Sequence, residues 1–425
     1  MLFFVLFAVV MGAAHYYIWK RLVLATTRPG RGRRVGTGVV VFLYLLVMAA
    51  LATGRLGGSG FGAAVAWPGF LWLAGAFYLA LFLGVLEVPR AVLLRVARRR
   101  RTRGRPVAVG AAGARASAES AADAAEGAAG SGEPPADGID ERPVDPGRRL
   151  FIARSLAVAG GVATAGVVTF GATQALGDPV VKRVPVTLGK LDQRLSGYRI
   201  AVVSDIHLGP LLGRAHTERI VRMINEQRVD LVAVVGDLVD GTVAELGEAA
   251  APLRDLVSTH GSFFVTGNHE YYSGAEPWLA ELERLGVNPL RNERLAIERA
   301  GASFDLAGVN DVNGEGFGDG PDFDRALAGR DPARPVVLLA HQPVQVREAA
   351  KRGVDLQLSG HTHGGQMFPF HLAVGLQQPV RSGLATVDGT QVYTSNGAGF
   401  WGPPVRVGAA PDITVVELRH KFAGR

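Results

Sequence analysis

An apolar, β-branched run leads directly into two ligand-type side chains in Tyr198-Arg199-Ile200-Ala201-Val202-Val203-Ser204-Asp205-Ile206-His207. An apolar run of this length predicts a buried strand. Residues 214–227 follow, with their apolar side chains on one face of a helix, and a second apolar run, 229–235, leads to Asp237. Strand, helix and strand over about thirty residues predict one βαβ unit.

Three later apolar runs end in the same way. Residues 262–266 lead to Asn268, residues 336–340 to His341, and residues 354–358 to His361 and His363. Because open α/β sheets carry their sites beyond the carboxyl ends of their strands, we expect these side chains to be adjacent in space. Asp, Asn and His are ligands that Mn, Fe and Zn accept. The sequence therefore predicts a divalent-metal site at one edge of a sheet.

The order of these clusters resembles that of the calcineurin-like metallophosphoesterases, in their membrane-associated or exported bacterial branch. The resemblance covers about residues 180–418. It implies an α/β fold, an α/β/β/α sandwich of two mixed sheets, here preceded by a helical transmembrane region. The matching motifs are Asp205-x-His207, Gly236-Asp237-x-x-Asp240, Gly267-Asn268-His269-Glu270, the lone His341, and Gly360-His361-x-His363.

The resemblance also implies two adjacent divalent metal ions, Mn, Fe or Zn. One would be held by Asp205, His207, Asp237 and His363, and the other by Asp237, Asn268, His341 and His361. A shared carboxylate offsets the repulsion between two cations about 3.5–4 Å apart. A metal-bridging hydroxide would attack phosphorus, because bound water has its pKa lowered toward about 7.

The resemblance further implies two catalytic residues, His269 and Asp237. His269 is not needed as a ligand, so its expected role is at the leaving oxygen. Asp240 and Glu270 are expected to orient their neighbours by hydrogen bonds. The Gly360-to-Gly365 run alone also fits a structural one-metal site.

Side chains outside the motifs carry weaker predictions. Four histidines are predicted to be surface or packing residues, and the nearest of them to the last motif, His371, is also a candidate substrate contact. Four aromatic residues either line a substrate groove or fill the core. These residues are His216, His260, His371 and His420, and Tyr271, Tyr272, Phe400 and Trp401.

Composition narrows the function classes. The 425 residues have room for about two or three domains. With no cysteine, disulfides, thiolate ligands and a cysteine nucleophile are excluded. The net charge of +7 divides into 20 basic and 9 acidic residues before Asp178, and 25 and 29 from there on, which is +11 and −4. The acidic second part lacks the net positive charge typical of proteins that bind nucleic acids, so no nucleic-acid partner is expected and a nuclease is disfavoured.

The first half predicts a membrane anchor. Within residues 1–105, three apolar stretches, 1–19, 39–53 and 64–88, approach the ~20 residues of a transmembrane helix. Buried helices of a soluble core are the alternative. Arginines crowd the first loop and the segment after the third stretch, which places both in the cytoplasm and the N-terminus outside.

The segments that follow predict a linker and a fourth helix. Residues 106–147 are poor in large apolar side chains and predict a disordered cytoplasmic linker. Residues 148–177 begin with Arg148-Arg149 and resemble an internal twin-arginine signal, although Gly147 stands where Ser or Thr is usual. They also predict a fourth transmembrane helix. Residues 178–425 form the predicted metallophosphoesterase domain, outside the cell membrane of a multi-pass protein.

We expect a membrane-anchored enzyme that hydrolyses a phosphodiester or pyrophosphate bond. Tethering favours a lipid-linked phosphoester, because an anchored enzyme meets membrane amphiphiles at high effective concentration. One alternative is a cell-surface phosphomonoesterase or nucleotidase. Another is a non-enzymatic membrane sensor with a vestigial metal site. The motifs leave the oligomeric state open.

Overall fold

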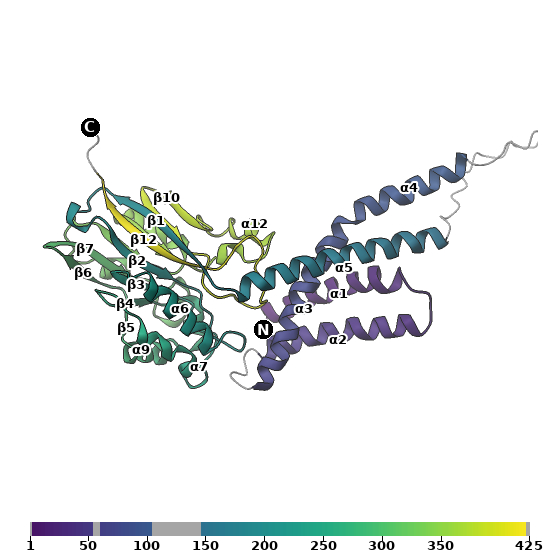
Figure 1. Ribbon diagram of the computed structural model, residues 1–425, viewed down its shortest axis with the longest axis horizontal. Coiled ribbons are helices and arrows are strands. Elements are labelled where there is room, and N and C mark those ends of the chain that lie inside the picture. The colour runs from purple at the N-terminus through teal and green to yellow at the C-terminus, as the bar shows by residue number, and fades with distance from the viewer. Residues whose placement is uncertain (1, 54–59, 104–145, 422–425) are drawn as a thin grey trace, which may run out of the picture.

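The computed structural model describes residues 2–53, 60–103 and 146–421. A group of long helices lies at one end of the molecule and an α/β domain at the other (Figure 1). The predicted linker, 106–147, lies outside the described residues except for its end, because the last long helix already begins at Pro146. This helix runs without a break through the predicted fourth span. The long helices are α1 Leu2–Ile18, α2 Arg31–Thr53, α3 Gly60–Val85, α4 Glu87–Arg103 and α5 Pro146–Leu176.

Three helices in the described part of the chain are long and apolar enough to cross a membrane. They span Arg31–Ala52, Gly62–Val96 and Gly147–Leu176. The first predicted span is helical too, but α1 has only 17 residues and passes into a π-helical turn at Trp19–Leu24. Since a span needs about 20 residues, the crossing of α1 stays a prediction.

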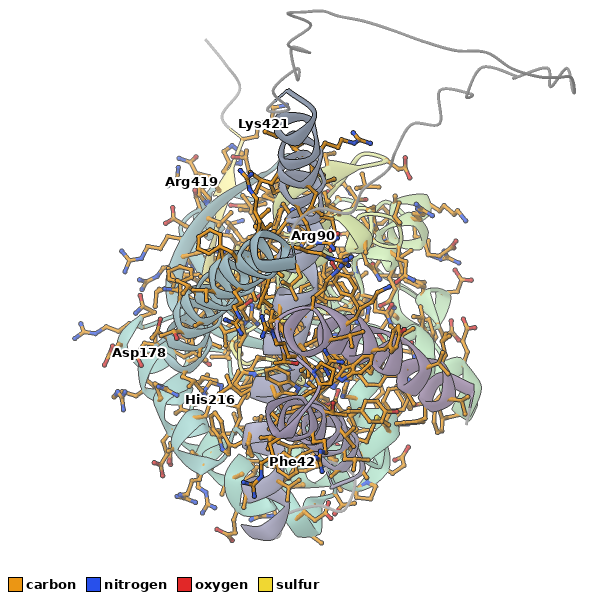
Figure 2. The ribbon with its side chains drawn as sticks, turned by 90° about the vertical axis from the view of Figure 1, so that its right-hand side faces the viewer. Phe42, Arg90, Asp178, His216, Arg419 and Lys421 are labelled. Atoms are coloured by element: carbon orange, nitrogen blue, oxygen red, sulfur yellow. The ribbon has the colours of Figure 1, made fainter. Side chains whose placement is uncertain are left out.

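The helices pack closely on one another and present apolar side chains outward. A Cβ at Gly69 of α3 would lie 2.4 Å from the Cβ of Ala50 in α2, so glycine permits this approach. Phe42 of α2 is 62% exposed and lies on the helical side of the molecule (Figure 2). Apolar side chains that point outward suit a lipid environment, because lipid tails are as apolar as the side chains and give no free-energy gain for burying them.

The α/β domain contains two six-stranded mixed sheets, which confirms the predicted fold class. In the first sheet β2 to β5 run parallel, whereas β12 pairs antiparallel with β2 and parallel with β1. In the second sheet β7, β8, β9 and β11 run parallel, with β6 and β10 antiparallel at the edges. The first sheet has the order β1 Val180–Leu188, β12 Asp412–His420, β2 Tyr198–Val203, β3 Leu231–Val235, β4 Ser262–Val265, β5 Val287–Pro289. The second has the order β10 Gly383–Val387, β11 Thr390–Thr394, β9 Leu356–Ser359, β8 Val336–Leu339, β7 Ala302–Gly308, β6 Glu293–Arg299.

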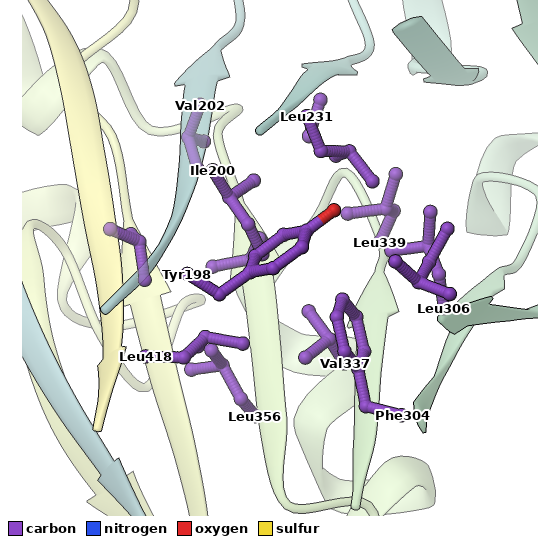
Figure 3. Packing of buried hydrophobic residues seen from close by; sticks show 14 of the residues in the cluster. Tyr198, Ile200, Val202, Leu231, Phe304, Leu306, Val337, Leu339, Leu356 and Leu418 are labelled. Carbon is purple, nitrogen blue, oxygen red and sulfur yellow. The ribbon is translucent and has the colours of Figure 1, made fainter. Parts of the chain in front are cut away.

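The two sheets pack face to face around one apolar core (Figure 3). Tyr198 of β2 meets Phe304 of β7 edge to face, with ring centroids 5.1 Å apart. Strands such as β3 are buried along their whole length, as parallel strands covered on both faces must be.

Short helices cover the outer faces of the sheets. Trp278 of α9 and Ile220 of α6 pack in the layer over the first sheet, and Phe323 of α10 and Ala349 of α11 pack over the second. The predicted helix 214–227 corresponds to α6. These helices are α6 Arg214–Glu226, α7 Val243–Ala250, α8 Asn268–Ser273, α9 Ala275–Arg284, α10 Phe323–Ala326, α11 Val346–Lys351 and α12 Phe370–Val374.

The domain docks directly on the long helices. The backbone N–H of Arg406 donates to the carbonyl of Gly171 in α5 at 2.9 Å. A Cβ at Gly171 would lie 2.5 Å from a methyl group of Val405, so only glycine allows this contact. Phe370 of α12 stacks on Phe77 of α3, with centroids 4.9 Å apart. The helices therefore hold one end of the domain by backbone and aromatic contacts.

Candidate metal centre

The predicted ligands lie at the carboxyl ends of strands from both sheets. Asp205 and His207 follow β2, Asp237 follows β3, and Asn268 follows β4. His341 follows β8 of the other sheet, and His361 and His363 follow β9. Because the sheets pack face to face, these chain segments converge at one edge of the sandwich. The structure thus brings together all seven predicted ligands.

One group of ligand atoms is formed by Asp205, His207 and His363. The Nε2 atom of His363 lies 3.3 Å from Oδ1 of Asp205 and 3.0 Å from Nε2 of His207. Two ring nitrogens and a carboxylate oxygen converging in this way suit a cation between them. These are three of the four residues predicted for the first metal position.

A second group is formed by Asp237, His341 and His361. The Nε2 atom of His341 lies 3.1 Å from Oδ2 of Asp237, and Nδ1 of His361 lies 3.0 Å from Oδ1 of Asn268. The same Oδ2 atom of Asp237 is 3.9 Å from Nε2 of His207. The carboxylate of Asp237 therefore faces both groups, as a shared ligand must.

The chemical state of two of these histidines fits divalent metals. Apart from its 3.1 Å ion-pair contact with Asp237, the buried Nε2 atom of His341 has no polar partner among the described residues. Burial by itself would lower the pKa of His341, but the carboxylate of Asp237 raises it. Burial lowers the pKa of His361 to about 3 and that of His363 well below its usual value. Both imidazoles are therefore neutral, which is the form that binds a metal.

The backbone at the site is strained. Asp205, His207, Asp237, His361 and His363 all have positive φ angles, between 50° and 70°. Such conformations cost of order 1–3 kcal/mol each and cluster at functional sites. The positive φ angles turn the side chains of neighbouring loop residues toward the same small volume.

Glycines before the ligands make room for them. A Cβ at Gly267 would lie 2.2 Å from Oδ1 of Asp237, and one at Gly360 would lie 2.3 Å from Oδ2 of Asp205. Side chains at either position would displace a ligand. The glycines of the sequence motifs therefore have a steric cause.

Two acidic residues, Asp240 and Glu270, contact the ligands or their backbone. Oδ1 of Asp240 lies 2.6 Å from Nδ1 of His269 and 3.1 Å from Nδ1 of His207. The buried carboxylate of Glu270 accepts hydrogen bonds from the backbone N–H groups of Asp237, Leu238 and Gly267. Both contacts suit the orienting roles expected for Asp240 and Glu270.

The ring of His269 lies at the rim of the site. Burial by itself would lower its pKa, but the carboxylates of Asp237 and Asp240 raise it to about 9. These carboxylates therefore favour the protonated ring, the form that has a proton to donate. Trp401 and Tyr272, 53% and 63% exposed, lie beside it with centroid distances of 5.8 and 5.6 Å. Of the four aromatic residues, these two line the rim, whereas Tyr271 and Phe400 are buried.

The other histidines lie outside the two ligand groups. His216 is buried, and burial lowers its pKa to about 4. His260 contacts the hydroxyl of Tyr198 at 2.9 Å. His420 contacts the carbonyl of Leu191 at 2.6 Å. The ring of His371 packs against that of Phe368 at 4.7 Å, and a role as a substrate contact stays a prediction.

Arg406 is a site residue that the motifs did not indicate. Only 1% of it is exposed, and its guanidinium donates to the carbonyls of His363, Asn396, Gly399 and Ala409. Burial lowers its pKa to about 10, so it stays charged at neutral pH. Its side chain fixes the ligand loop at His363 while its backbone holds α5. An arginine between Val405 and Val407 in an apolar run is the sequence signal that could have pointed to it.

Replacing Gly171 with Val is expected to lower the hydrolytic rate at least about tenfold, because the new side chain would push the segment around Arg406 away from α5. Gly166→Val is the matched control, since a Cβ there meets no atom within 4 Å in the same helix. Rates would be measured for the full chain in detergent. Equal rates in the two variants would show that docking does not position the ligand loop.

Comparisons with known proteins agree on the type of domain. Residues 198–365 match the model of the calcineurin-like phosphoesterase family. An uncharacterized metallophosphoesterase of Helicobacter pylori strain J99 is 40% identical over 279 residues, which are 65% of this chain and 74% of that protein. A Bos taurus transmembrane protein with a metallophosphoesterase domain is 39% identical over 289 residues, 65% of this chain and 64% of that protein. An uncharacterized metallophosphoesterase of Aquifex aeolicus is 35% identical over 52% of this chain and 85% of that protein.

Proposed function

Since the chain belongs to the calcineurin-like metallophosphoesterase family and is a metal-dependent phosphoric ester hydrolase, we propose that it cleaves a phosphodiester or pyrophosphate bond at a binuclear site. The observation that carries this proposal is the place of Asp237, whose Oδ2 atom faces His341 at 3.1 Å and His207 at 3.9 Å. A carboxylate between two ligand groups suits two cations rather than one.

Seven residues would hold the metal ions. Asp205, His207 and His363 would bind one, Asn268, His341 and His361 the other, and Asp237 both. Two such ions would supply Lewis-acid polarisation of the phosphoryl oxygens and an activated water. The chain itself contributes His269, which would donate its proton to the leaving oxygen. Asp240 would hold that ring in place through the contact at 2.6 Å.

The membrane position of the domain is a further part of the proposal. We place it outside the cytoplasmic membrane of a multi-pass protein, held by an uncleaved α5 and exported along a twin-arginine-type route. Arg148, Arg149 and Arg154 precede the apolar part of α5, which supports a cytoplasmic start of that helix.

A single cysteine tests this topology, because the chain has none of its own. Asp388→Cys places it in the exposed turn between β10 and β11. A membrane-impermeant maleimide is expected to label this variant in intact cells. Labelling only after lysis would contradict the outward placement.

We infer that the substrate is an amphiphile, a lipid-linked phosphoester. Tethering raises the encounter rate with membrane substrates. The exposed rings of Trp401 and Tyr272 at the rim suit an apolar leaving group. The alternatives are a cell-surface phosphomonoesterase or nucleotidase, and a sensor with a vestigial site. The complete ligand set argues against the sensor.

Paired substrates test the reaction class. The full chain in detergent, stripped of metal, would be assayed with a chromogenic phosphodiester and a phosphomonoester in the presence of Mn, Fe or Zn. Metal-restored hydrolysis that prefers the diester is expected. A preference for the monoester would favour the phosphomonoesterase, and inactivity of a folded, metal-loaded chain on either ester and on a lipid-linked pyrophosphate would favour the sensor.

A further inference from the structure

The segment around α12 carries an unusual exposed surface. Phe368, Phe370, Leu372 and Leu376 are 49%, 48%, 67% and 87% exposed. No Asp, Glu, Lys or Arg occurs between Gly364 and Val380. A helix on a water-facing surface normally carries charged residues on its outer face, so this surface is suited to an apolar partner.

The same segment lies against a candidate membrane helix. Phe370 stacks on Phe77 of α3 at 4.9 Å, and Met367 is buried with Ala74 and Tyr78. These α3 residues belong to the candidate span Gly62–Val96. Figure 1 shows α12 at the end of the domain that faces the long helices. The exposed apolar surface of α12 is thus continuous with that of the helices.

The position of α5 indicates how deep in the bilayer the α12 segment meets the long helices. Ala172 packs in the same cluster as Met367 and lies four residues before the end of α5 at Leu176. At 1.5 Å per residue, this is about 6 Å from the end of the helix. Headgroups add roughly 5–7 Å on each side of the hydrocarbon. An α5 that ends at the outer surface of the headgroups would therefore place the cluster at the boundary between headgroups and hydrocarbon.

We propose that residues 368–376, comprising α12 and its flanks, form an interfacial element whose apolar side chains contact the acyl chains of the phospholipid bilayer. Burying such side chains at the boundary removes apolar surface from water. The partner is lipid rather than protein because the surface continues that of the adjacent span.

Both ends of the interfacial element are tied to the metal centre. The amide of Gln366 forms two hydrogen bonds with the backbone of Trp401, at 3.0 and 3.1 Å, and Trp401 lies beside His269. The hydroxyl of Thr362, between two predicted ligands, donates to the carbonyl of Arg381 at 2.6 Å. The rim of the site is therefore held at headgroup level. A metal centre at this level would select amphiphiles whose phosphoester lies in the headgroup layer, an inference that rests on the proposed function.

Single-cysteine labelling tests the lipid contact independently of catalysis. Leu372→Cys, Leu376→Cys and the control Asp388→Cys would carry an environment-sensitive fluorophore on the full chain. The chain would be placed in phosphatidylethanolamine–phosphatidylglycerol vesicles with or without spin-labelled lipid. Strong quenching at 372 and 376 but not at 388 is expected. Equal, weak quenching at all three positions, or shielding at 372 and 376 that lipid quenchers do not reach, would overturn the proposal.

A charge substitution tests the link to the substrate. Leu372→Asp combined with Leu376→Asp is expected to raise KM for a lipid phosphoester in vesicles about tenfold, while hydrolysis of a soluble chromogenic ester stays unchanged. Val257→Asp is the matched control, because Val257 is 67% exposed and lies in the loop before β4, at the edge of the sheet opposite the metal centre. Unchanged KM for the lipid substrate would contradict the link. A native chain that is inactive on both esters would refute the proposed function, whereas the fluorophores would still report whether residues 372 and 376 contact lipid.

Discussion

Replacing Asp237 with Asn is expected to lower metal-dependent hydrolysis by about a thousandfold, because a shared charge that stabilises both cations is removed while the shape of the side chain is kept. The Oδ1 atom of the native carboxylate accepts a hydrogen bond from the backbone of His269 at 2.9 Å, and an amide oxygen can keep it. The fold should therefore survive. Steady-state rates at saturating metal would measure the loss.

A surface substitution of the same kind controls for this result. Asp388→Asn changes an exposed turn residue with a positive φ angle that asparagine also tolerates. This variant should keep its full rate and metal content. An Asp237→Asn variant that still hydrolyses the diester within about tenfold of the native rate would show that Asp237 does not bridge two metals.

Replacing His269 with Ala is expected to lower the rate by about 10²–10⁴-fold, the usual contribution of a general acid. The loss should be largest for an alkyl ester, whose leaving oxygen needs a proton. It should be smaller for a nitrophenyl ester, whose leaving group departs as an anion. Rates on the two esters, with metal content measured on the same samples, would separate an acid from a ligand.

His260→Ala is the matched control for this experiment. His260 precedes β4 and so lies at the opposite edge of the same sheet, in contact with Tyr198. Its replacement should leave both esters unaffected. If His269→Ala lost metal together with activity on both esters, His269 would act as a ligand, a position that its place beside Asp237 and His207 also allows.

The ligands could be predicted from the sequence because each is marked locally. An acidic, amide or histidine side chain follows each apolar run, directly after a glycine in three of the five clusters, and the strand end fixes where it points. The α/β/β/α sandwich followed from the same runs through the family resemblance. Asp237 is the clearest example, because the family resemblance predicts a shared ligand there and its Oδ2 atom faces both His207 and His341.

Features that depend on distant chain segments could not be predicted in this way. The apolar neighbours of Arg406 indicate that it is buried but not what it binds, because the carbonyls it contacts come from residues 363 and 396–409. Tyr271 and Tyr272 are neighbours of the same type, yet one is buried and the other exposed at the rim. Burial of this kind is decided by tertiary packing and not by residue type.

The membrane helices differ from prediction mainly at their ends. The second strictly apolar stretch is 39–53, which the small residues around Gly36 and Gly38 can extend. The helix α2 begins earlier still, at Arg31, because arginine has a high helix propensity and polar residues can extend an apolar helix. The third was expected at 64–88, whereas α3 ends at Val85 and the arginine-rich segment after it forms α4. The length of an apolar run predicts the part of a helix that crosses the membrane, but not the residues at which the helix begins and ends.

Titrating the metal-stripped full chain with Mn, Fe or Zn while recording phosphodiester hydrolysis and bound metal is the most direct test of a binuclear metal-dependent hydrolase. Activity that is absent without metal and rises until two ions are bound per chain is the predicted result. Hydrolysis that persists in the stripped chain, or that reaches its maximum with one ion bound, would contradict the account.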